Sequence, residues 1–364
     1  MNDLTKKWNF FLLALSLFII CPVSVMAGSN YNIGVYYFPG WSPGVRGPKM
    51  PDSWAPIKSY KEREPLLNWY DDAQVSVLNQ QLQWMHNYGI NFVVFDWYWD
   101  GTKPFLDQSI NAYLQADSRH LVKYSLLWAN HFDVPNNKEQ FRGMVQYWLN
   151  NYFKKSEYQR INGRPVVFIF SPDRLRDNTK KFGSSVRELL DMAQQMSRDA
   201  GLPGIYFVMA TPALDYWVKG FAADAGFSAL SAYNYHQGYS GTPASSTPQS
   251  HSYTELDADY RQNWDWILSN SKLPYFIPMT SGWDKRPWGG SRDSSHDNSL
   301  STPSEFAIHL RAAKSRMDAY PQQTHHMGVI CCWNEFGEGS YIEPTQQNGF
   351  ADLEQVQRVF GQSK

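Results

Sequence analysis

Two glutamates near the end of the chain have a spacing that suits acid–base chemistry. Glu335 and Glu338 lie three residues apart in CCWNEFGEGSYIEP, residues 331–344, and the apolar run Met327–Trp333 leads directly into them. Glycoside hydrolysis uses two carboxyl groups that flank one bond, one protonated and the other ionised. Positions i and i+3 of a continued strand face opposite ways. We therefore expect a turn at Gly337 that brings both carboxylates to one cavity.

The same spacing also fits an acidic turn whose glutamates cap the following helix or pair with arginine. Neighbouring aromatic side chains favour the chemical interpretation, because desolvation beside Trp and Tyr raises the pKa of a carboxyl group. Each pKa unit corresponds to about 1.4 kcal/mol between the two protonation states. One member of such a pair could then stay protonated while the other is charged.

Further polar and aromatic side chains lie where apolar runs end. Asp96 has apolar neighbours on both sides, and a buried Asp is costly unless it is hydrogen-bonded. It is either a ligand of sugar hydroxyls or a structural hydrogen-bonding group. His131 and His236 could bind hydroxyls or could be satisfied structural histidines. The predicted substrate-binding residues are Tyr37, Trp41, Asp96, Trp97, Tyr98, Trp99, Trp128, Asn130, His131, Tyr233, Tyr235, Trp283, Trp333 and Asn334.

Several other kinds of site leave no signature in the sequence. It contains no HExxH motif, no paired cysteine clusters and no EF-hand loop, so no metal site is predicted. It also contains no GxSxG motif, which weakens a serine-esterase interpretation. We predict no cofactor.

The candidate residues depend for their position on an alternation of short apolar runs and helical patterns. The helical patterns cover residues 71–88, 139–153, 180–199, 255–270 and 304–320. The apolar runs, eight in number, are Asn32–Phe38, Asn91–Trp97, Lys123–Ala129, Pro165–Ser171, Ile205–Thr211, Phe227–Tyr233, Tyr275–Met279 and Met327–Trp333.

Such an alternation predicts parallel strands with crossover helices. Eight units in one domain favour an α/β fold, a single (β/α)8 barrel with long βα loops. A doubly wound open sheet is the alternative, but no glycine-rich phosphate loop follows the first run. Barrel active sites lie at the C-terminal strand ends, where the long segments 39–69, 236–253 and 281–301 would also lie. We expect the seventh strand to end near Pro278 and the last of these helices to start at Ser304.

Composition restricts the choice of partner. The chain has 364 residues, a formal net charge of -1, and 15 Trp, 22 Tyr and 21 Phe. The near-neutral balance gives no electrostatic reason to expect nucleic acid or an anionic membrane. The aromatic residues form either a large core or platforms for the apolar faces of sugar rings. The expected partner is an oligo- or polysaccharide, and the oligomeric state is not predicted.

The N-terminus resembles a secretory leader. Lys6 and Lys7 precede an apolar stretch, 10–20, that is short for a membrane span, and Val25-Met26-Ala27 suits cleavage before residue 28. We predict a signal peptide over 1–27, a catalytic domain over 28–364, and a secreted or periplasmic location without a membrane span after cleavage. An uncleaved anchor is the alternative.

Two cysteines, Cys331 and Cys332, remain after the leader. Adjacent residues of a strand point to opposite faces of the sheet. A bond between these two sulfurs would need a distorted backbone, so we predict buried free thiols.

At this point a family resemblance emerges. The stretch WNEFGEGSYIEP resembles the signature of the glycoside hydrolase family 99-like domain, and GINFVVFDWYWDG, YSLLWANHF and INGRPVVFIFSP agree in order. The resemblance spans about residues 32–360. Glycoside hydrolase family 71, with aspartate at the first acidic place of the motif, is similar as well.

The resemblance implies a (β/α)8 barrel and retaining, typically endo-acting cleavage of an α-linked glycan such as α-mannan. It implies that Glu335 acts as base on the 2-hydroxyl of the sugar and that Glu338 protonates the departing oxygen. A 1,2-anhydro sugar would form transiently, and Tyr233 would match an active-site tyrosine. Phe336-Gly337 stands where characterised mannan-cleaving members carry Trp-His, so the mannan substrate is not carried over.

Two other functions are compatible with the sequence. A glycosyltransferase would need an activated donor, against which the leader and the missing phosphate-binding loop argue. A non-catalytic carbohydrate-binding barrel is the other possibility, and the presence of both glutamates argues against it.

Overall fold

The computed structural model describes residues 31–235 and 249–361. The predicted signal peptide, 1–27, and His236 lie outside the described residues. Within them, every helix is too short or too polar to cross a bilayer.

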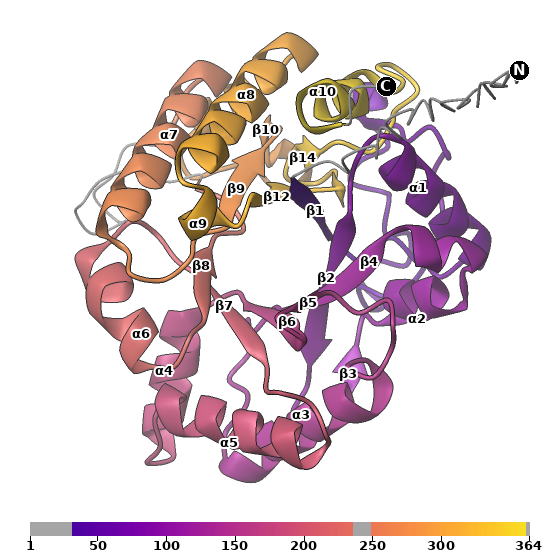
Figure 1. Cartoon of the computed structure of the whole chain (residues 1–364). Helices are drawn as coiled ribbons and strands as arrows, with labels where there is room; N and C mark the ends of the chain where they lie inside the picture. Colours follow the sequence, from indigo (N-terminus) through magenta and orange to yellow (C-terminus); the bar gives the residue numbers. More distant parts are fainter. Residues whose placement is uncertain (1–30, 236–248, 362–364) are drawn as a thin grey trace, which may run out of the picture.

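Parallel strands form a ring that confirms the predicted (β/α)8 barrel (Figure 1). In ring order the strands are β8-β7-β6-β4-β2-β1-β12-β9. A single bridge between Leu230 and Tyr275 joins the two ends of this order. The bounds are β1 Asn32–Tyr37, β2 Phe92–Trp99, β4 Lys123–Trp128, β6 Arg164–Ile169, β7 Tyr206–Ala210, β8 Ala229–Ser231, β9 Ile277–Thr280 and β12 Met327–Cys331.

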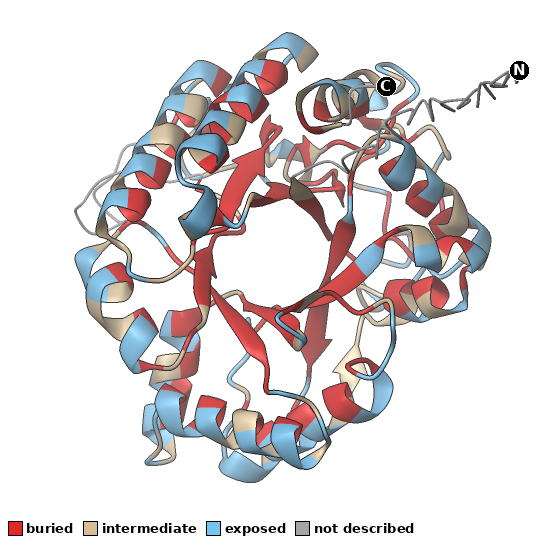
Figure 2. Cartoon of the chain, in the orientation of Figure 1, coloured by how far each residue is buried: buried red, intermediate tan, exposed pale blue. Residues whose placement is uncertain are grey.

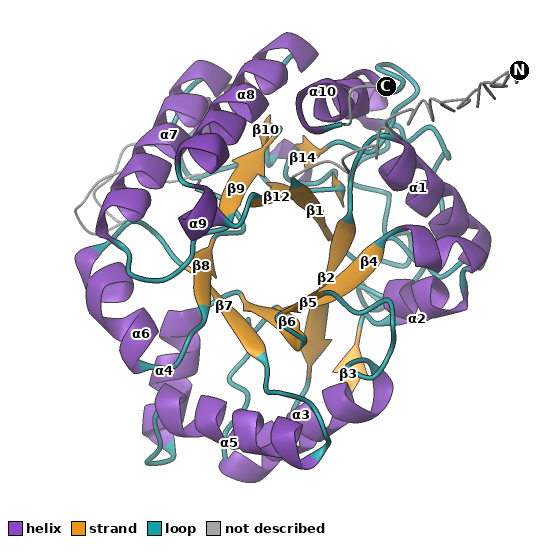
Figure 3. Ribbon diagram, in the orientation of Figure 1, coloured by secondary structure: helices purple, strands orange, loops and turns teal. Residues whose placement is uncertain are grey.

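The helices surround the strands as an outer layer (Figure 3). Their bounds are α1 Val75–Asn87, α2 Gln108–Gln115, α3 Lys138–Asn151, α4 Pro172–Lys181, α5 Val186–Asp199, α6 Ala222–Asp224, α7 Tyr253–Asn270, α8 Pro303–Ala319, α9 Pro321–Thr324 and α10 Ala351–Phe360. Short strands decorate the ring: β3 Pro104–Phe105, β5 Arg160–Ile161, β10 Gly282–Trp283, β11 Ser299–Leu300, β13 Asn334–Glu335 and β14 Ser340–Tyr341. The remaining turns of helix are η1 Lys61–Arg63, η2 Asp117–Leu121, the π-helix η3 Tyr216–Phe221, η5 Arg286–Trp288 and η6 Ser294–Asn298.

The barrel strands are buried on both faces (Figure 2), as expected when helices cover a parallel sheet. Alternate residues enter two separate clusters. In β2, Val93 and Phe95 pack toward the helices, whereas Phe92 and Val94 belong to a smaller cluster with Phe168. Because side chains alternate along a strand, this difference decides which side chains at each strand end face inward.

All eight predicted strands are present, but two boundary predictions were wrong. β9 continues through Pro278, which is paired with Val329 of β12. Its other neighbour, β8, is joined only by the bridge at Tyr275, so the missing N–H of proline interrupts no ladder there. The predicted helix 180–199 is two helices, α4 and α5, separated by Gly183 with φ +66°.

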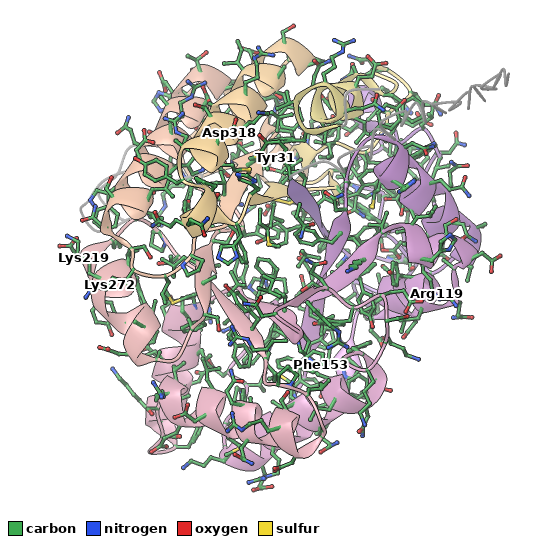
Figure 4. All side chains as sticks on the ribbon, viewed as in Figure 1. Tyr31, Arg119, Phe153, Lys219, Lys272 and Asp318 are labelled. Atoms are coloured by element: carbon green, nitrogen blue, oxygen red, sulfur yellow. A yellow bond between two sulfur atoms is a disulfide. The ribbon has the colours of Figure 1, made fainter. Side chains whose placement is uncertain are left out.

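The first strand is fixed to the helical layer at its start. The hydroxyl group of Tyr31 donates to the carboxylate of Asp318 in α8, and Figure 4 labels both residues. The Lys314 ammonium lies 4.7 Å from the Tyr31 ring centroid. Helix α8, which packs against α10, therefore carries contacts that set the position of β1.

Helix α8 begins at Pro303, one residue before the predicted Ser304, with a capping box at Thr302. The Thr302 side chain accepts a hydrogen bond from the Glu305 backbone at 3.3 Å, and the Glu305 carboxylate accepts from the Thr302 backbone at 2.8 Å. Pro303 occupies the first helical position, where its missing N–H costs nothing.

Replacing the capping residue should destabilise the protein, whereas replacing Ser304 should not. We expect Thr302→Ala to lower the free energy of unfolding by about 1 kcal/mol. The exposed Ser304→Ala, which removes no cap, should change it by less than about 0.5 kcal/mol. Urea unfolding of both variants measures the difference, and equal losses would contradict the capping role.

Candidate active site

Glu335 and Glu338 lie on a tight hairpin that follows the last barrel strand. Glu335 pairs with Ser340 between β13 and β14, and the Glu338 N–H donates to the Glu335 carbonyl at 3.1 Å. The predicted turn is confirmed, but Gly337 has a different role from the one expected. Positive φ occurs at Gly339, +70°, rather than at Gly337. Gly337 is needed for space, because a Cβ there would lie 2.1 Å from the Trp288 ring.

A buried ion pair holds this hairpin against the loop that follows β9. The guanidinium of Arg63 contacts the carboxylate of Asp284, and both side chains are fully buried. The same guanidinium donates to the Phe336 carbonyl at 2.7 Å. The Asp284 backbone N–H donates to the Glu338 carbonyl at 2.7 Å. Phe336 and Glu338 of the hairpin are thus both held by hydrogen bonds from outside it.

Tyr233 brings the carboxylate of β2 together with that of the hairpin. Its hydroxyl oxygen lies 3.0 Å from Asp96 Oδ2 and 3.3 Å from Glu335 Oε1. A tyrosine hydroxyl carries one hydrogen, so it can donate to only one of the two acids at a time. Protonation of the other carboxyl group would satisfy both contacts.

Burial raises the pKa of all three carboxyl groups, and repulsion adds to the rise for two of them. Burial is the main cause for Asp96 and for Glu335, and Glu338 adds repulsion to both. Burial raises the pKa of Glu338 to about 7, with the nearby Lys285 opposing the shift. For Glu335, Arg46 opposes the rise. A pair of titratable groups of this kind is typical of catalytic sites.

Polar atoms without partners surround the same hairpin. The buried atoms Asp96 Oδ1, Glu335 Oε2, Arg46 Nη1 and Trp288 Nε1 have no hydrogen-bond partner in the described structure. Most buried polar groups in proteins are hydrogen-bonded. Four such atoms beside one turn therefore indicate a place for a polar ligand.

A row of rings forms one wall of the site. Tyr98 lies 5.8 Å from His131, His131 lies 4.6 Å from Phe170, and Phe170 lies 5.5 Å from Tyr233, measured between ring centroids. Tyr98 is also close enough to Asp96, Glu335 and Glu338 for their charges to raise the pKa of its hydroxyl, after burial as the main cause. The structure therefore brings together both glutamates and four predicted substrate-binding residues: Asp96, Tyr98, His131 and Tyr233.

Other predicted residues lie inside the barrel wall. The side chains of Tyr37, Trp97, Trp128 and Trp333 are 0–1% exposed and pack in the core between strands and helices. Trp41 is also fully buried, but it stacks on Trp54 beside the hairpin, 5.9 Å from the Phe336 ring centroid. Tyr235 and Trp99 belong to the same core. Strand alternation is the physical reason: along β2, the side chains of Asp96 and Tyr98 face inward, so Trp97 and Trp99 face the helices.

Two predicted polar residues have structural partners. The Asn130 side chain exchanges two hydrogen bonds with the Ser171 backbone, at 2.7 and 2.8 Å. The Asn334 side chain accepts from the Phe38 N–H at 2.8 Å and donates to its carbonyl at 3.0 Å, which ties the hairpin to the end of β1. The Trp283 indole donates to Ser291 at 2.9 Å within the loop after β9.

The cysteine prediction was wrong. Cys331 and Cys332 form a disulfide bond rather than free thiols. The expectation assumed an ordinary strand, but the peptide bond between them is cis, which places their Cα atoms 3.0 Å apart. The predicted burial of both residues is correct.

Sequence reasoning did not find Arg46, Arg63, Lys285 and Trp288. All four lie in the two long segments, 39–69 and 281–301, that were expected at the active-site end. An inventory of charged residues in those segments would have found the cations. The contact between Trp288 and Gly337 has no sequence signal.

Comparison with known proteins places this architecture in a family. The family described as Glycosyltransferase WbsX matches residues 58–356, which include Arg63, Asp96, Tyr233 and both glutamates of the hairpin. The chain belongs to the WbsX family. Curated relatives from two strains of Xanthomonas campestris pv. campestris, both described as uncharacterized protein WxcX, are 21% identical over 322 and 316 residues. These alignments cover 80% of this chain, which spans 42% of the length of those relatives.

Solved structures show the fold of this WbsX-family chain in glycoside hydrolases. A glycoside hydrolase-like protein aligns with a TM-score of 0.65 at 16% identity, covering 93% of this chain and 96% of that one. The family 99 endo-alpha-mannosidase from Bacteroides thetaiotaomicron aligns with a TM-score of 0.60 at 12% identity, covering 90% and 95%. The predicted resemblance to family 99 is thus confirmed for the fold.

Removing one member of the buried ion pair should destabilise the site strongly. We expect Arg63→Met to lower the free energy of unfolding by about 3–5 kcal/mol, because it removes the buried partner of the Asp284 carboxylate and leaves the Phe336 carbonyl without its donor. The matched control is Arg286→Met, which removes the second, 54% exposed arginine bonded to Asp284. That loss should be about 0–1 kcal/mol. Chemical denaturation compares the two, and similar losses would contradict the role of Arg63.

Proposed function

We propose that the protein is a glycoside hydrolase that cleaves an α-linked polysaccharide or glycan, acting within the chain and with retention. The observation that carries the proposal is the pair of glutamates on one hairpin, both with raised pKa values, beside the buried Asp96–Tyr233 contact. Glycoside hydrolysis typically uses two carboxyl groups in a desolvated site, one protonated and one ionised. The fold shared with glycoside hydrolases supports the proposal.

In the proposed mechanism, Glu335 takes the proton of the substrate's 2-hydroxyl group. The 2-oxygen attacks the anomeric carbon while Glu338 gives its proton to the departing oxygen, so the glycosidic bond breaks as a 1,2-anhydro sugar forms. Water then opens this ring: Glu338 takes the proton of the water and Glu335 returns its proton to the 2-oxygen. A direct attack by Glu335 on the anomeric carbon is the alternative. Tyr233 would hold Glu335 in position in either case.

Burial raises the pKa of both glutamates, that of Glu338 to about 7. The proposed reaction proceeds from the singly protonated pair, with the proton on Glu338 and Glu335 ionised. Because two interacting sites titrate as a unit, activity follows the charge of the pair.

Glycosyl transfer is the second candidate, because the family carries that description. It would require binding of a nucleotide sugar. Calorimetric titration with nucleotide sugars tests it, and binding would favour transfer over hydrolysis. A secreted or periplasmic location also remains a proposal that depends on residues 1–27.

Cleavage should depend on both glutamates of the hairpin. Glu335→Gln and Glu338→Gln should each lower the rate of polysaccharide cleavage by about 10²–10⁴-fold, because an acid–base group typically contributes that much. Product chromatography after incubation with α-mannans, α-glucans and bacterial polysaccharides measures cleavage, and circular dichroism checks the fold.

Glu343→Gln is the matched control for these variants. Burial raises the pKa of Glu343 to about 8, so this carboxyl group is protonated near neutral pH and resembles Gln. It contacts Tyr70 and Gln81 instead of the active-site cluster. We expect near-normal activity in Glu343→Gln, and full activity in either of the other two variants would sink the proposal.

The rate of cleavage should pass through a maximum as pH increases. Below about pH 7 both glutamates hold protons and no base is present, so kcat/KM should rise as pH increases through about 7. It should fall again at higher pH, when the pair loses its second proton. Lys285→Gln should move the rising limb to higher pH, because Lys285 lowers the pKa of Glu338. A pH–rate profile with a maximum below pH 6 would contradict this assignment.

A further inference from the structure

Two cations, Arg46 and Lys285, come close to Trp288 or its backbone, next to the hairpin that carries the glutamates. Arg46 comes from the long loop after β1, and its guanidinium carbon lies 4.5 Å from the Trp288 ring centroid and 5.9 Å from that of Phe38. Trp288 itself contacts Gly337 of the hairpin. The stacked guanidinium is therefore held over the turn that carries Glu335 and Glu338.

The guanidinium of Arg46 has an unused hydrogen-bond donor. Its Nη1 atom is buried and has no hydrogen-bond partner in the described part of the chain. Burial lowers the pKa of this arginine, and the nearby Glu335 charge opposes the shift. A buried guanidinium nitrogen without an acceptor is costly, so a ligand that supplies an acceptor would be favoured here.

Lys285 adds a second positive charge on the same side. It immediately precedes η5, and the Trp288 N–H donates to its carbonyl at 2.9 Å. The adjacent carboxylate, Asp284, is already bound by Arg63 and by Arg286. The Asp284 carboxylate is thus paired with Arg63 and Arg286, and it is not the partner of Arg46 or Lys285.

The carboxylates of the site lie toward the other wall. Asp96 and Glu335 meet at Tyr233, which packs against Phe170 and Tyr36. The site therefore has an acidic wall around Tyr233 and a cationic rim around Trp288. A neutral sugar chain would bring no charged acceptor to the buried Arg46 Nη1 atom.

We propose that Arg46, with Lys285, binds the carboxylate of an acidic sugar, so that the substrate is an α-linked polysaccharide containing uronic acid. The inference rests on the proposed hydrolase function and specifies its substrate class. The planar fork of arginine matches the two oxygens of a carboxylate. The Trp288 face that already supports the guanidinium limits its rotation, which lowers the entropy lost when a carboxylate binds.

A different role for Arg46 would be to keep Glu335 ionised. In that role, loss of Arg46 would slow the cleavage of acidic and neutral substrates alike and would shift the pH–rate profile. Binding of a substrate carboxylate predicts instead that loss of Arg46 affects the acidic substrate much more than its neutral counterpart. The ratio between matched substrates separates the two roles.

The experiment compares α-linked, uronic-acid-containing bacterial polysaccharides with their carboxyl-reduced forms, in which each carboxylate has become a primary alcohol. Neutral α-mannan and α-glucan complete the panel. We expect the native acidic form to have a kcat/KM about 10- to 100-fold above that of the reduced form, as for loss of a charge-assisted hydrogen bond. Arg46→Gln should remove this preference by lowering cleavage of the native acidic form far more than that of the reduced form, and Arg46→Lys should retain part of the preference.

Arg164→Gln is the matched control. Its guanidinium lies 4.6 Å from the Tyr206 ring centroid, so it is also stacked on an aromatic ring, but it begins β6 at the opposite end of the barrel. This variant should keep both the activity and the preference of the original protein.

Binding separates failure of the inference from failure of the hydrolase proposal. Calorimetry with the Glu338→Gln variant uses an α-linked galacturonic acid tetrasaccharide and its carboxyl-reduced form as probes. Preference for the acidic probe that Arg46→Gln abolishes supports the inference even if no polysaccharide is cleaved. Cleavage of neutral chains at least as fast as acidic ones overturns the inference and leaves the hydrolase proposal standing. Absence of any preference in both binding and cleavage, or equal effects of Arg46→Gln on both substrate forms, also overturns it.

Discussion

The buried ion pair between Arg63 and Asp284 determines where both glutamates stand. Burying two opposite charges is expensive unless further hydrogen bonds complete their shells. Here the extra partners are backbone groups of the hairpin that carries Glu335 and Glu338: the Phe336 carbonyl accepts from Arg63, and the Glu338 carbonyl accepts from the Asp284 N–H. The loop after β1, the loop after β9 and the hairpin after β12 are therefore assembled as one unit, and none of them can position the carboxylates alone.

This assembly explains how a barrel keeps three carboxyl groups near one another. Asp96 is placed by β2, Glu335 by the hairpin, and Tyr233 after β8 lies between them. Their repulsion is accommodated by protonation, since burial raises the pKa of each group. The charges that oppose the rise, Arg46 and Lys285, come from the two loops that the ion pair connects. The two loops that the ion pair stabilises thus also carry the charges that set the electrostatics of the site.

Local patterns were enough to predict the barrel, because each strand is a continuous apolar run and each helix follows its own period. The two glutamates and Asp96 could also be found, since a carboxylate at the end of an apolar run is conspicuous. The tryptophans were harder: Trp97 and Trp99 stand beside Asp96 in sequence, yet strand alternation sends them into the core. The partners of the hairpin could not be predicted, because Arg63 and Asp284 are 221 residues apart and meet only after the barrel closes.

The close packing of Trp288 on Gly337 has a consequence for how such sites can diverge. The indole fills the space that any side chain at position 337 would need. A homologue with a larger residue at 337, such as the histidine of mannan-cleaving enzymes, must therefore carry a smaller or displaced residue at 288. The two positions, 49 residues apart, should covary, and a lineage could change the sugar it recognises only by altering both loops together.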